Sequence, residues 1–224
     1  MKYGESLFDI FYLVYAIMTG VIILRKRGDL TGKLMGSAVL ILGFGDAFHL
    51  VPRVLNYFVT GDFTMWLGLG KLITSVTMTL FYLLVYRIWL KVYGEPEDRK
   101  LSMALYLLAV VRIILCLMPQ NRWLQNESSV LWGVLRNIPF VALGCVVVAL
   151  FYSRRNAEPC FRQAWLLIAL SFLFYIPVAV AASLVPMLGM LMLPKTVCYI
   201  LLIRCFRKYA EGNEKSTSSV PRNE

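Results

Sequence analysis

Charged residues are scarce in this chain, and their scarcity alone excludes one class of protein. Lys, Arg, Asp and Glu make up 16% of the 224 residues, whereas 59% are hydrophobic and the mean hydropathy is +0.67. An average soluble domain has about 25% charged residues. The chain is therefore too apolar for a soluble globular domain of this size, and we expect an all-α protein embedded in a lipid bilayer.

Patterns that bind metals or nucleotides are also missing. The five cysteines include no C-x-x-C pair, and we place Cys116, Cys145 and Cys198 inside apolar spans and Cys160 and Cys205 at their cytoplasmic edge. A disulfide framework or a zinc site is therefore not expected. The sequence has no G-x-G-x-x-G, no phosphate-binding loop and no loop long enough for a soluble domain, so the chain cannot be an ATP-driven pump by itself. We expect no metal and no cofactor.

The sequence does contain several long apolar runs. A helix needs about 20 apolar residues to cross the hydrocarbon of a bilayer. We predict one transmembrane domain over residues 1–208, a bundle of seven helices, followed by a disordered cytoplasmic tail over residues 209–224. Residues 164–194 carry no charge, and we divide them at Pro186 into two legs of a tight helical hairpin. The predicted spans are about 6–24, 34–57, 63–90, 101–119, 130–151, 165–184 and 186–206.

Basic residues between the spans predict the orientation of the chain. Of the 23 Lys and Arg residues, 16 follow the first, third, fifth and seventh spans, and only Lys2 and Arg122 lie on the opposite side. The positive-inside rule then places the N-terminus outside and the C-terminus in the cytoplasm of a multi-pass protein of the cell membrane. The net charge of +10 needs no nucleic acid to explain it. The expected partners are membrane lipids, and a homo-oligomer is left open.

Five basic residues inside the predicted spans are the clearest indication of function. They are Arg53, Lys71, Arg112, Arg136 and Lys195. A charge at the centre of a bilayer costs about 2.5–3.5 kcal/mol on insertion scales, so such residues normally face a protein interior or a water-filled cavity. Counting along the spans places all five in the outer half of the bilayer or at its midplane, with Lys195 near the middle of the seventh span. We therefore expect a cationic cavity in the outer half.

The spans contain too few carboxylates to neutralise these cations. Asp9 and Asp46 are available, and Asp46 shares one helical face with His49 and Arg53 because they follow at i+3 and i+7. Two ion pairs can be drawn, such as Asp46 with Lys71 or Arg112, and the remaining cations then lack an acidic partner. A small anionic solute or a lipid headgroup is the simplest counter-charge. The residues predicted to bind it are Asp46, His49, Arg53, Lys71, Arg112, Arg136, Asn137, Lys195 and Tyr199.

This pattern favours a protein that transports or senses a small anion rather than an enzyme, although alternatives remain open. An intramembrane enzyme acting on a lipid could use Asp46 and His49 as an acid–base pair while the basic residues hold a phosphate. In a structural or accessory protein the charges would pair among themselves. Arg53 and Arg136 could also extend to the outer headgroups.

Three resemblances bear on these alternatives. A lysine midway along the last of seven helices, followed nine residues later by Arg204, resembles the microbial rhodopsins, as do Tyr175 and Pro177 in the sixth span. That resemblance implies a retinal-type chromophore bound to Lys195 as a Schiff base. The chain departs from the family in its third span, where Lys71 occupies the helix that carries the carboxylate counterion.

The other two resemblances concern the whole chain. Seven spans with an external N-terminus are similar in layout to the small sugar transporters built as three plus one plus three helices, and lysines in spans three and seven fit such a repeat. The first span lacks that family's proline pattern. The strings Gly45-Asp46-Ala47-Phe48-His49-Leu50-Val51-Pro52-Arg53 and Gly189-Met190-Leu191-Met192-Leu193-Pro194-Lys195-Thr196 resemble those of small multi-pass bacterial membrane proteins without an assigned function.

Small residues and tryptophans beside the charged positions predict how the helices pack. Gly45 precedes Asp46, and Gly68 and Gly70 precede Lys71, so we expect close helix contacts beside both charged sites. Trp123 is expected in the aromatic belt at the outer membrane interface.

Overall fold

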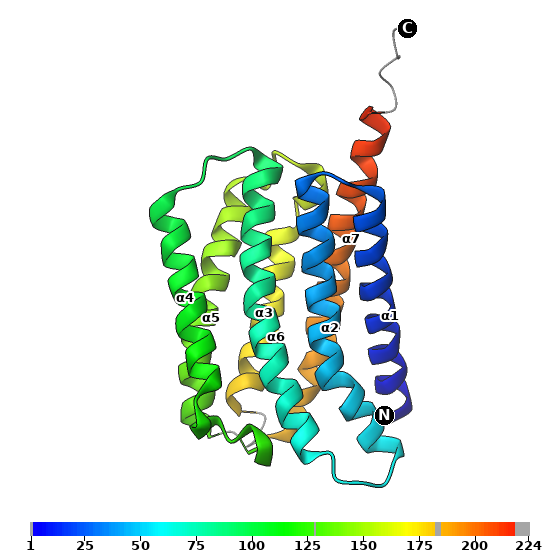
Figure 1. Cartoon of the computed structure of the whole chain (residues 1–224), viewed down its shortest axis with the longest axis vertical. Coiled ribbons are helices and arrows are strands. Elements are labelled where there is room, and N and C mark those ends of the chain that lie inside the picture. Colours follow the sequence, from blue (N-terminus) through cyan, green and yellow to red (C-terminus); the bar gives the residue numbers. More distant parts are fainter. Residues whose placement is uncertain (1, 128, 182–184, 218–224) are drawn as a thin grey trace, which may run out of the picture.

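Seven long α-helices account for most of the chain in the computed structural model, which describes residues 2–127, 129–181 and 185–217 (Figure 1). All seven are long and apolar enough to cross a membrane, which confirms the predicted all-α, multi-pass architecture. Four short 3₁₀ helices lie between them. In chain order the elements are α1 (Lys2–Lys26), α2 (Leu30–Phe58), α3 (Thr64–Tyr93), α4 (Arg99–Leu117), η1 (Pro119–Asn121), η2 (Trp123–Gln125), α5 (Val130–Ser153), η3 (Pro159–Phe161), α6 (Ala164–Ala181), η4 (Pro186–Leu191) and α7 (Met192–Thr217).

Local sequence signals fix several helix ends. The side chain of Asp29 accepts a hydrogen bond from the backbone N–H of Gly32 and caps α2. Asp98 caps α4 in the same way through the N–H groups of Lys100 and Leu101. The helix α3 ends at Gly94, whose φ of 63° is left-handed and therefore favours glycine. Such caps satisfy backbone groups that have no partner within the helix.

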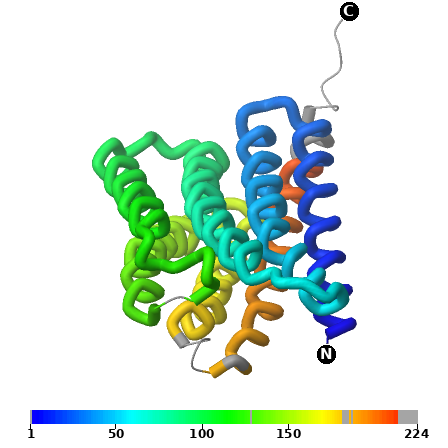
Figure 2. The backbone as a smooth tube through the Cα atoms, turned by 60° about the horizontal axis from the view of Figure 1, so that its bottom comes forward, coloured from blue at the N-terminus to red at the C-terminus, as the bar shows by residue number. Residues whose placement is uncertain are grey.

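The helices form a ring in chain order. Each α-helix packs against the next one along the chain, and α7 returns to contact α1 and closes the ring (Figures 1 and 2). The start of α1 and the end of α7 lie at opposite ends of the bundle (Figure 1). We call them the N-terminal end, where the α2–α3, α4–α5 and α6–α7 connections also lie, and the C-terminal end. Their sidedness in the membrane remains a prediction from the basic loops.

Large apolar side chains cover the outside of the ring. Leu7 is 71% exposed, Met103 is 68% exposed and Leu173 is 61% exposed. Soluble monomers rarely expose extensive apolar surface of this kind, whereas a protein in lipid requires it. The seven spans and this apolar exterior together identify an integral multi-pass membrane protein.

Aromatic side chains fill the interior toward the C-terminal end. We call this cluster the aromatic core, and its rings are tightly packed: the Tyr82 ring centroid lies 5.1 Å from that of Phe172 and 5.4 Å from that of Phe140. The Tyr82 hydroxyl also lies within hydrogen-bond distance of Ser171 Oγ, at 3.1 Å, and of Tyr199 Oη, at 3.3 Å. Its fully buried members are Phe81, Tyr82, Tyr86, Phe151, Phe161 and Phe206.

The last two helices differ from the predicted hairpin. Part of the predicted turn at residues 183–186 lies outside the described residues, and α7 begins at Met192 after the 3₁₀ helix η4. Lys195 is therefore in the first turn of α7, not at the middle of the span. Pro194 fits this position because the first turn of a helix does not need the N–H that proline lacks.

The helix α7 also continues further than expected. It extends to Thr217, so the prediction of a disordered tail is corrected for residues 209–217, while residues 218–224 lie outside the described residues. Arg207 Nε donates a hydrogen bond to Glu211 Oε1 at 2.9 Å, one helical turn away. An i,i+4 pair of this kind stabilises a helix even where the sequence has become polar.

Candidate functional site

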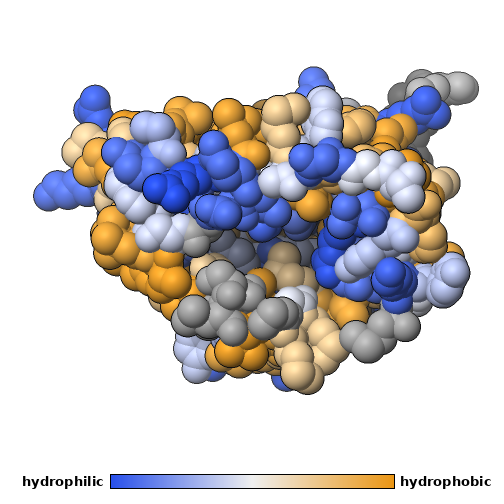
Figure 3. All heavy atoms as spheres, turned by 90° about the horizontal axis from the view of Figure 1, so that it is seen from below, coloured by the Kyte–Doolittle hydropathy of each residue, from blue (hydrophilic) through white to orange (hydrophobic). Residues whose placement is uncertain are grey.

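A cavity of about 500 Å³ occupies the interior of the bundle toward the N-terminal end. Residues from α2 to α7 line it, together with the connection between α4 and α5. Figure 3 views the molecule from this end and shows a central hollow with polar residues along two of its sides. Six of the nine predicted site residues are among the lining residues: His49, Arg53, Lys71, Arg112, Arg136 and Lys195.

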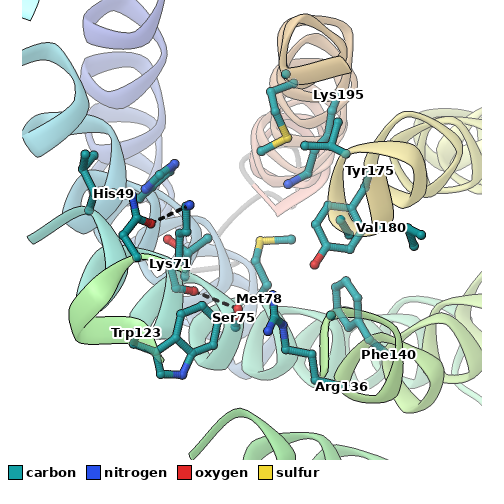
Figure 4. A pocket seen from close by; sticks show the side chains of 18 of the residues that line it. His49, Lys71, Ser75, Met78, Trp123, Arg136, Phe140, Tyr175, Val180 and Lys195 are labelled. Carbon is teal, nitrogen blue, oxygen red and sulfur yellow. Dashed lines mark hydrogen bonds between the residues drawn. The ribbon is translucent and has the colours of Figure 1, made fainter. Parts of the chain in front are cut away.

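The connection between α4 and α5 positions two of these cations. Lys71 Nζ donates a hydrogen bond to Asn126 Oδ1 at 2.7 Å, and Arg136 Nη1 donates one to Asn121 Oδ1 at 2.6 Å. The guanidinium carbon of Arg136 also lies 4.6 Å from the centre of the Trp123 ring (Figure 4). A neutral amide thus holds Lys71, and a neutral amide and a ring face are among the partners of Arg136.

Hydrogen bonds to the end of α4 hold this connection in place. The side-chain amide of Asn121 donates to the carbonyl of Leu115 at 2.7 Å, and Trp123 Nε1 donates to the carbonyl of Cys116 at 2.7 Å. Arg122 and Asn126 adopt left-handed backbone conformations, with φ of 47° and 55°. Trp123 is 9% exposed and belongs to this wall, which corrects its predicted place in an interfacial belt.

Arg112 is the most deeply buried cation of the site. It is 1% exposed, and its guanidinium carbon lies 3.5 Å from the centre of the Phe140 ring. Its Nη1 donates to Asn137 Oδ1 at 3.2 Å, whereas its Nε has no hydrogen-bond partner. Asn137 lies behind the cavity lining and also accepts a hydrogen bond from the Tyr175 hydroxyl at 2.8 Å. Asn137 therefore positions a cation of α4 and a ring of α6 together.

Lys195 faces the cavity from α7 beside that same ring. Its Nζ lies 4.7 Å from the centre of the Tyr175 ring (Figure 4). It also lies 5.4 Å from the centre of the Tyr199 ring. The residue is 5% exposed, and its ammonium group donates no hydrogen bond within the described part of the chain. Tyr199 packs behind Lys195 and is oriented by its hydroxyl contact with Tyr82.

The two predicted residues of α2 that lie nearest the N-terminal end of the bundle differ in their partners. Arg53 forms an ion pair with Glu5 of α1, and the Tyr57 hydroxyl donates to the same carboxylate at 3.2 Å. His49 lines the cavity, and its buried Nδ1 has no hydrogen-bond partner. Glu5 was not predicted as a partner of Arg53, because it precedes the first predicted span.

Asp46 is turned away from the cavity. Its Oδ2 accepts a hydrogen bond from the Tyr12 hydroxyl of α1 at 2.6 Å, and none of the drawn ion pairs with Lys71 or Arg112 forms among the described residues. The cation whose charge acts on Asp46 is Lys195. Asp46 and His49 likewise share no hydrogen bond in the part of the chain that the structure describes, so the geometry of an acid–base pair is not formed.

Two glycines of α3 bring the walls of the site together. A Cβ atom on Gly70 would lie 2.7 Å from the Cα atom of His49, and one on Gly68 would overlap the carbonyl of Trp123. The first contact sets α3 against α2, and the second sets α3 against the α4–α5 connection. These contacts agree with the close packing that the glycines predict.

Several residues of the site gave no separate signal in the sequence. Asn121 and Asn126 lie in a polar connection where amides are common, and only the folded connection brings them to the cations. Within the described residues, no group of three or more His, Cys, Asp or Glu side chains is arranged to hold a metal ion.

The site therefore combines five basic groups, aromatic faces and amides around one cavity. Comparison with known proteins gave no match to this chain among family models, curated proteins or solved structures.

Proposed function

We propose that this membrane protein binds a small organic anion in the cavity and serves its transport or its sensing. One observation carries the proposal: five Lys and Arg residues line the cavity, whereas no Asp or Glu is among the lining residues that the structure describes. A cluster of like charges is unfavourable where its members are buried, as Arg112 and Lys195 are, unless an opposite charge is present for part of the time.

The lack of acidic partners is clearest for three of these basic residues. Lys71, Arg112 and Lys195 form no ion pair among the described residues. Their neighbours are the amides of Asn126 and Asn137 and the rings of Phe140 and Tyr175. Such groups stabilise a cation without cancelling its charge, so an anion entering the cavity would be attracted by Lys71 and Arg112. At Lys195 the anion would act together with the charge of Asp46.

The lining also defines the class of anion. Cavities for small organic ligands typically enclose about 300–1,000 Å³, and the volume here is about 500 Å³. Met78, Phe140, Tyr175 and Val178 add apolar and aromatic surface between the basic groups. A carboxylate or phosphate attached to a small apolar or aromatic body matches both features better than an inorganic ion does.

The direction of entry follows from the predicted orientation. The hollow lies at the N-terminal end, and the basic loops favour an external N-terminus, so the ligand would enter from outside the cell membrane. The aromatic core closes the opposite half of the bundle. Transport would therefore require this core to open, whereas sensing would require only a change that binding transmits through it.

Binding by the purified protein in detergent tests the proposal. The probes are benzoate, phenyl phosphate and glycerol 3-phosphate, with benzamide as the neutral counterpart of benzoate. At least one anion is expected to raise the unfolding temperature and to bind in calorimetry, while benzamide does neither. Binding of an anionic phospholipid in place of all three soluble anions would identify a lipid headgroup as the source of the charge.

Substitutions locate the binding site. Lys71→Met or Arg112→Met is expected to weaken binding about 10- to 100-fold, since a hydrogen bond to a charged group contributes about 1.5–3 kcal/mol. Lys100→Met removes the same charge from an exposed position at the opposite end of α4 and should leave the affinity unchanged. Failure of every anion to bind the folded protein, or equal affinity in all three variants, would reject the proposal.

A further inference from the structure

We propose that Asp46 takes up a proton when an anion binds beside Lys195, so that the site loads an anion and a proton together. This inference rests on the proposed function and adds the coupling between the ligand and a proton.

The position of Asp46 behind the cavity wall is the first argument. The helices α2 and α7 are in contact, and the charges of Asp46 and Lys195 interact although no direct ion pair forms between them. Lys195 faces the cavity, while Asp46 is absent from its lining. An anion in the cavity therefore approaches Lys195 from the cavity side, whereas the charge of Asp46 acts on Lys195 from behind the cavity wall.

Within the described part of the chain, Lys195 is the cation that acts on Asp46. From α1 it faces Tyr12, which donates the hydrogen bond to Oδ2, and the buried carboxyl group of Asp9. From α7 it faces Lys195 and Tyr199. From α3 the neighbouring contact is that of the neutral Thr74 hydroxyl with the carbonyl of Gly45, at 2.9 Å. Lys195 is thus the single cation among these facing groups.

Charge balance then links the two events. In the empty site the charge of Lys195 compensates that of the Asp46 carboxylate. A bound anion pairs with Lys195. The negative charges of the anion and of Asp46 then share one ammonium group in a poorly solvated interior, which is unfavourable. A proton from the solvent that bonds to a carboxylate oxygen of Asp46 restores neutrality. Asp46 Oδ1 accepts no hydrogen bond within the described residues, so it is available for this proton.

His49 provides a route for the proton. It lies one turn from Asp46 along α2, it lines the cavity, and its Nδ1 has no partner. A neutral imidazole has one N–H group and one acceptor nitrogen, so it can accept a proton at one nitrogen and release one from the other between the water of the cavity and Asp46. His49 affects the path of the proton and not the number taken up.

Calorimetry of anion binding at neutral pH measures the coupling. The probe is benzoate, or whichever of the three soluble anions binds most tightly, and the buffers are Tris and Bis-Tris, which are cationic and differ in ionisation enthalpy. The difference in observed enthalpy is expected to give about one proton taken up per anion, with affinity falling about tenfold per unit rise in pH where Asp46 titrates.

Three variants assign the proton. Asp46→Asn is expected to bind the anion without proton uptake, whereas Asp9→Asn and His49→Gln should retain the uptake. Infrared difference spectra of the unsubstituted protein provide a readout that does not depend on the folding of a variant, because anion binding should add the carbonyl band of a protonated carboxylic acid.

The outcomes separate this inference from the proposed function. Anion binding without proton uptake, or uptake that persists in Asp46→Asn because another group such as Lys195 takes the proton, would overturn the inference and leave anion binding intact. Absence of the infrared band would also overturn it. Absence of anion binding to the folded protein would remove the proposed function itself.

Discussion

The two halves of the bundle differ in how the same seven helices pack: the half toward the N-terminal end encloses a cavity, and the other half is filled by aromatic rings. Toward the N-terminal end, α3 presents Lys71 and Ser75 to a cavity, whereas two to three turns further along it presents Phe81 and Tyr82 to the fully packed aromatic core. The five basic residues of the site lie in the first region, and aromatic rings fill the second. A membrane protein can thus keep charges within its spans by holding them at one end of a bundle that is closed at the other.

The boundary between the halves consists of interlocking rings. Phe140 lines the cavity and contacts both Tyr82 and Phe172, with ring centroids 5.4 Å and 4.9 Å apart. Gly144 allows the Phe172 ring to approach α5 so closely that a Cβ atom would collide with it. This layer separates the water-accessible cavity from the packed interior, and any change that binding produces must pass through it.

Removing a ring from the aromatic core is expected to have the largest effect on stability. Phe81→Ala should lower the free energy of unfolding by about 3–5 kcal/mol, because the side chain is fully buried and a cavity remains. Phe44→Ala removes the same side chain from a position that is 52% exposed on the outside of the ring. Its effect should be much smaller in detergent unfolding experiments, and equal losses would contradict the contrast between core and exterior.

Widening a close contact beside the cavity should cost less but also affect binding. Gly70→Ala places a Cβ atom against His49 and the backbone of α2, and such overpacking typically costs about 1–3 kcal/mol. The measurements are unfolding in detergent and affinity for the anion. Gly4→Ala has open space around it and serves as the matched substitution: it makes the same change within a helix without a collision, so it should not lower stability and should leave the affinity unchanged. A neutral effect of Gly70→Ala would show that α2 and α3 are not fixed by this contact.

A carboxylate beside Arg112 should separate stability from binding. Asn137→Asp keeps an acceptor for Arg112 and Tyr175 but adds a negative charge and loses the hydrogen bond from Asn137 Nδ2 to the carbonyl of Gly133, so the protein should stay folded with a loss of stability of about 0.5–1.5 kcal/mol. Anion affinity should fall about tenfold or more, since the new charge competes for Arg112. Unchanged affinity would place the anion elsewhere. Asn126→Ala, which removes an acceptor from Lys71 without adding charge, is the comparison.

The smallest effect is expected outside the spans, at the cap of α2. Asp29→Ala should cost about 1 kcal/mol or less, because it removes the N-cap of the helix at a position open to solvent. The hydrogen bond from Arg27 holds the pKa of Asp29 below its usual value of 3.8. The stabilisation is thus present above pH 3.8 and is lost as the pH falls through the lower folded-state value. Unfolding measured against pH should show this loss in the unsubstituted protein and not in Asp29→Ala.

The sequence predicted the basic residues of the site better than it predicted the side chains that hydrogen-bond or pair with them. Lys71, Arg112, Arg136 and Lys195 were predicted from their cost in lipid, which depends only on residue type and position in an apolar run. Their neighbours Asn121 and Asn126 come from an unremarkable polar loop, and Glu5 precedes the first predicted span. The expected pairing of Asp46 with Lys71 or Arg112 was wrong because helix rotation turns Asp46 toward Tyr12 of α1.

The sequence by itself determined that this protein has seven helices long enough to span a membrane and that its intramembrane cations gather toward one end. Both properties follow from hydropathy and from distance along a helix, which are local. Only the tertiary structure decided that these cations share a cavity and that amides and rings rather than acids hold most of them. It also decided that aromatic rings fill the half of the bundle toward the C-terminal end. Those features depend on which faces of separate helices meet, and packing sets the rotation of each helix.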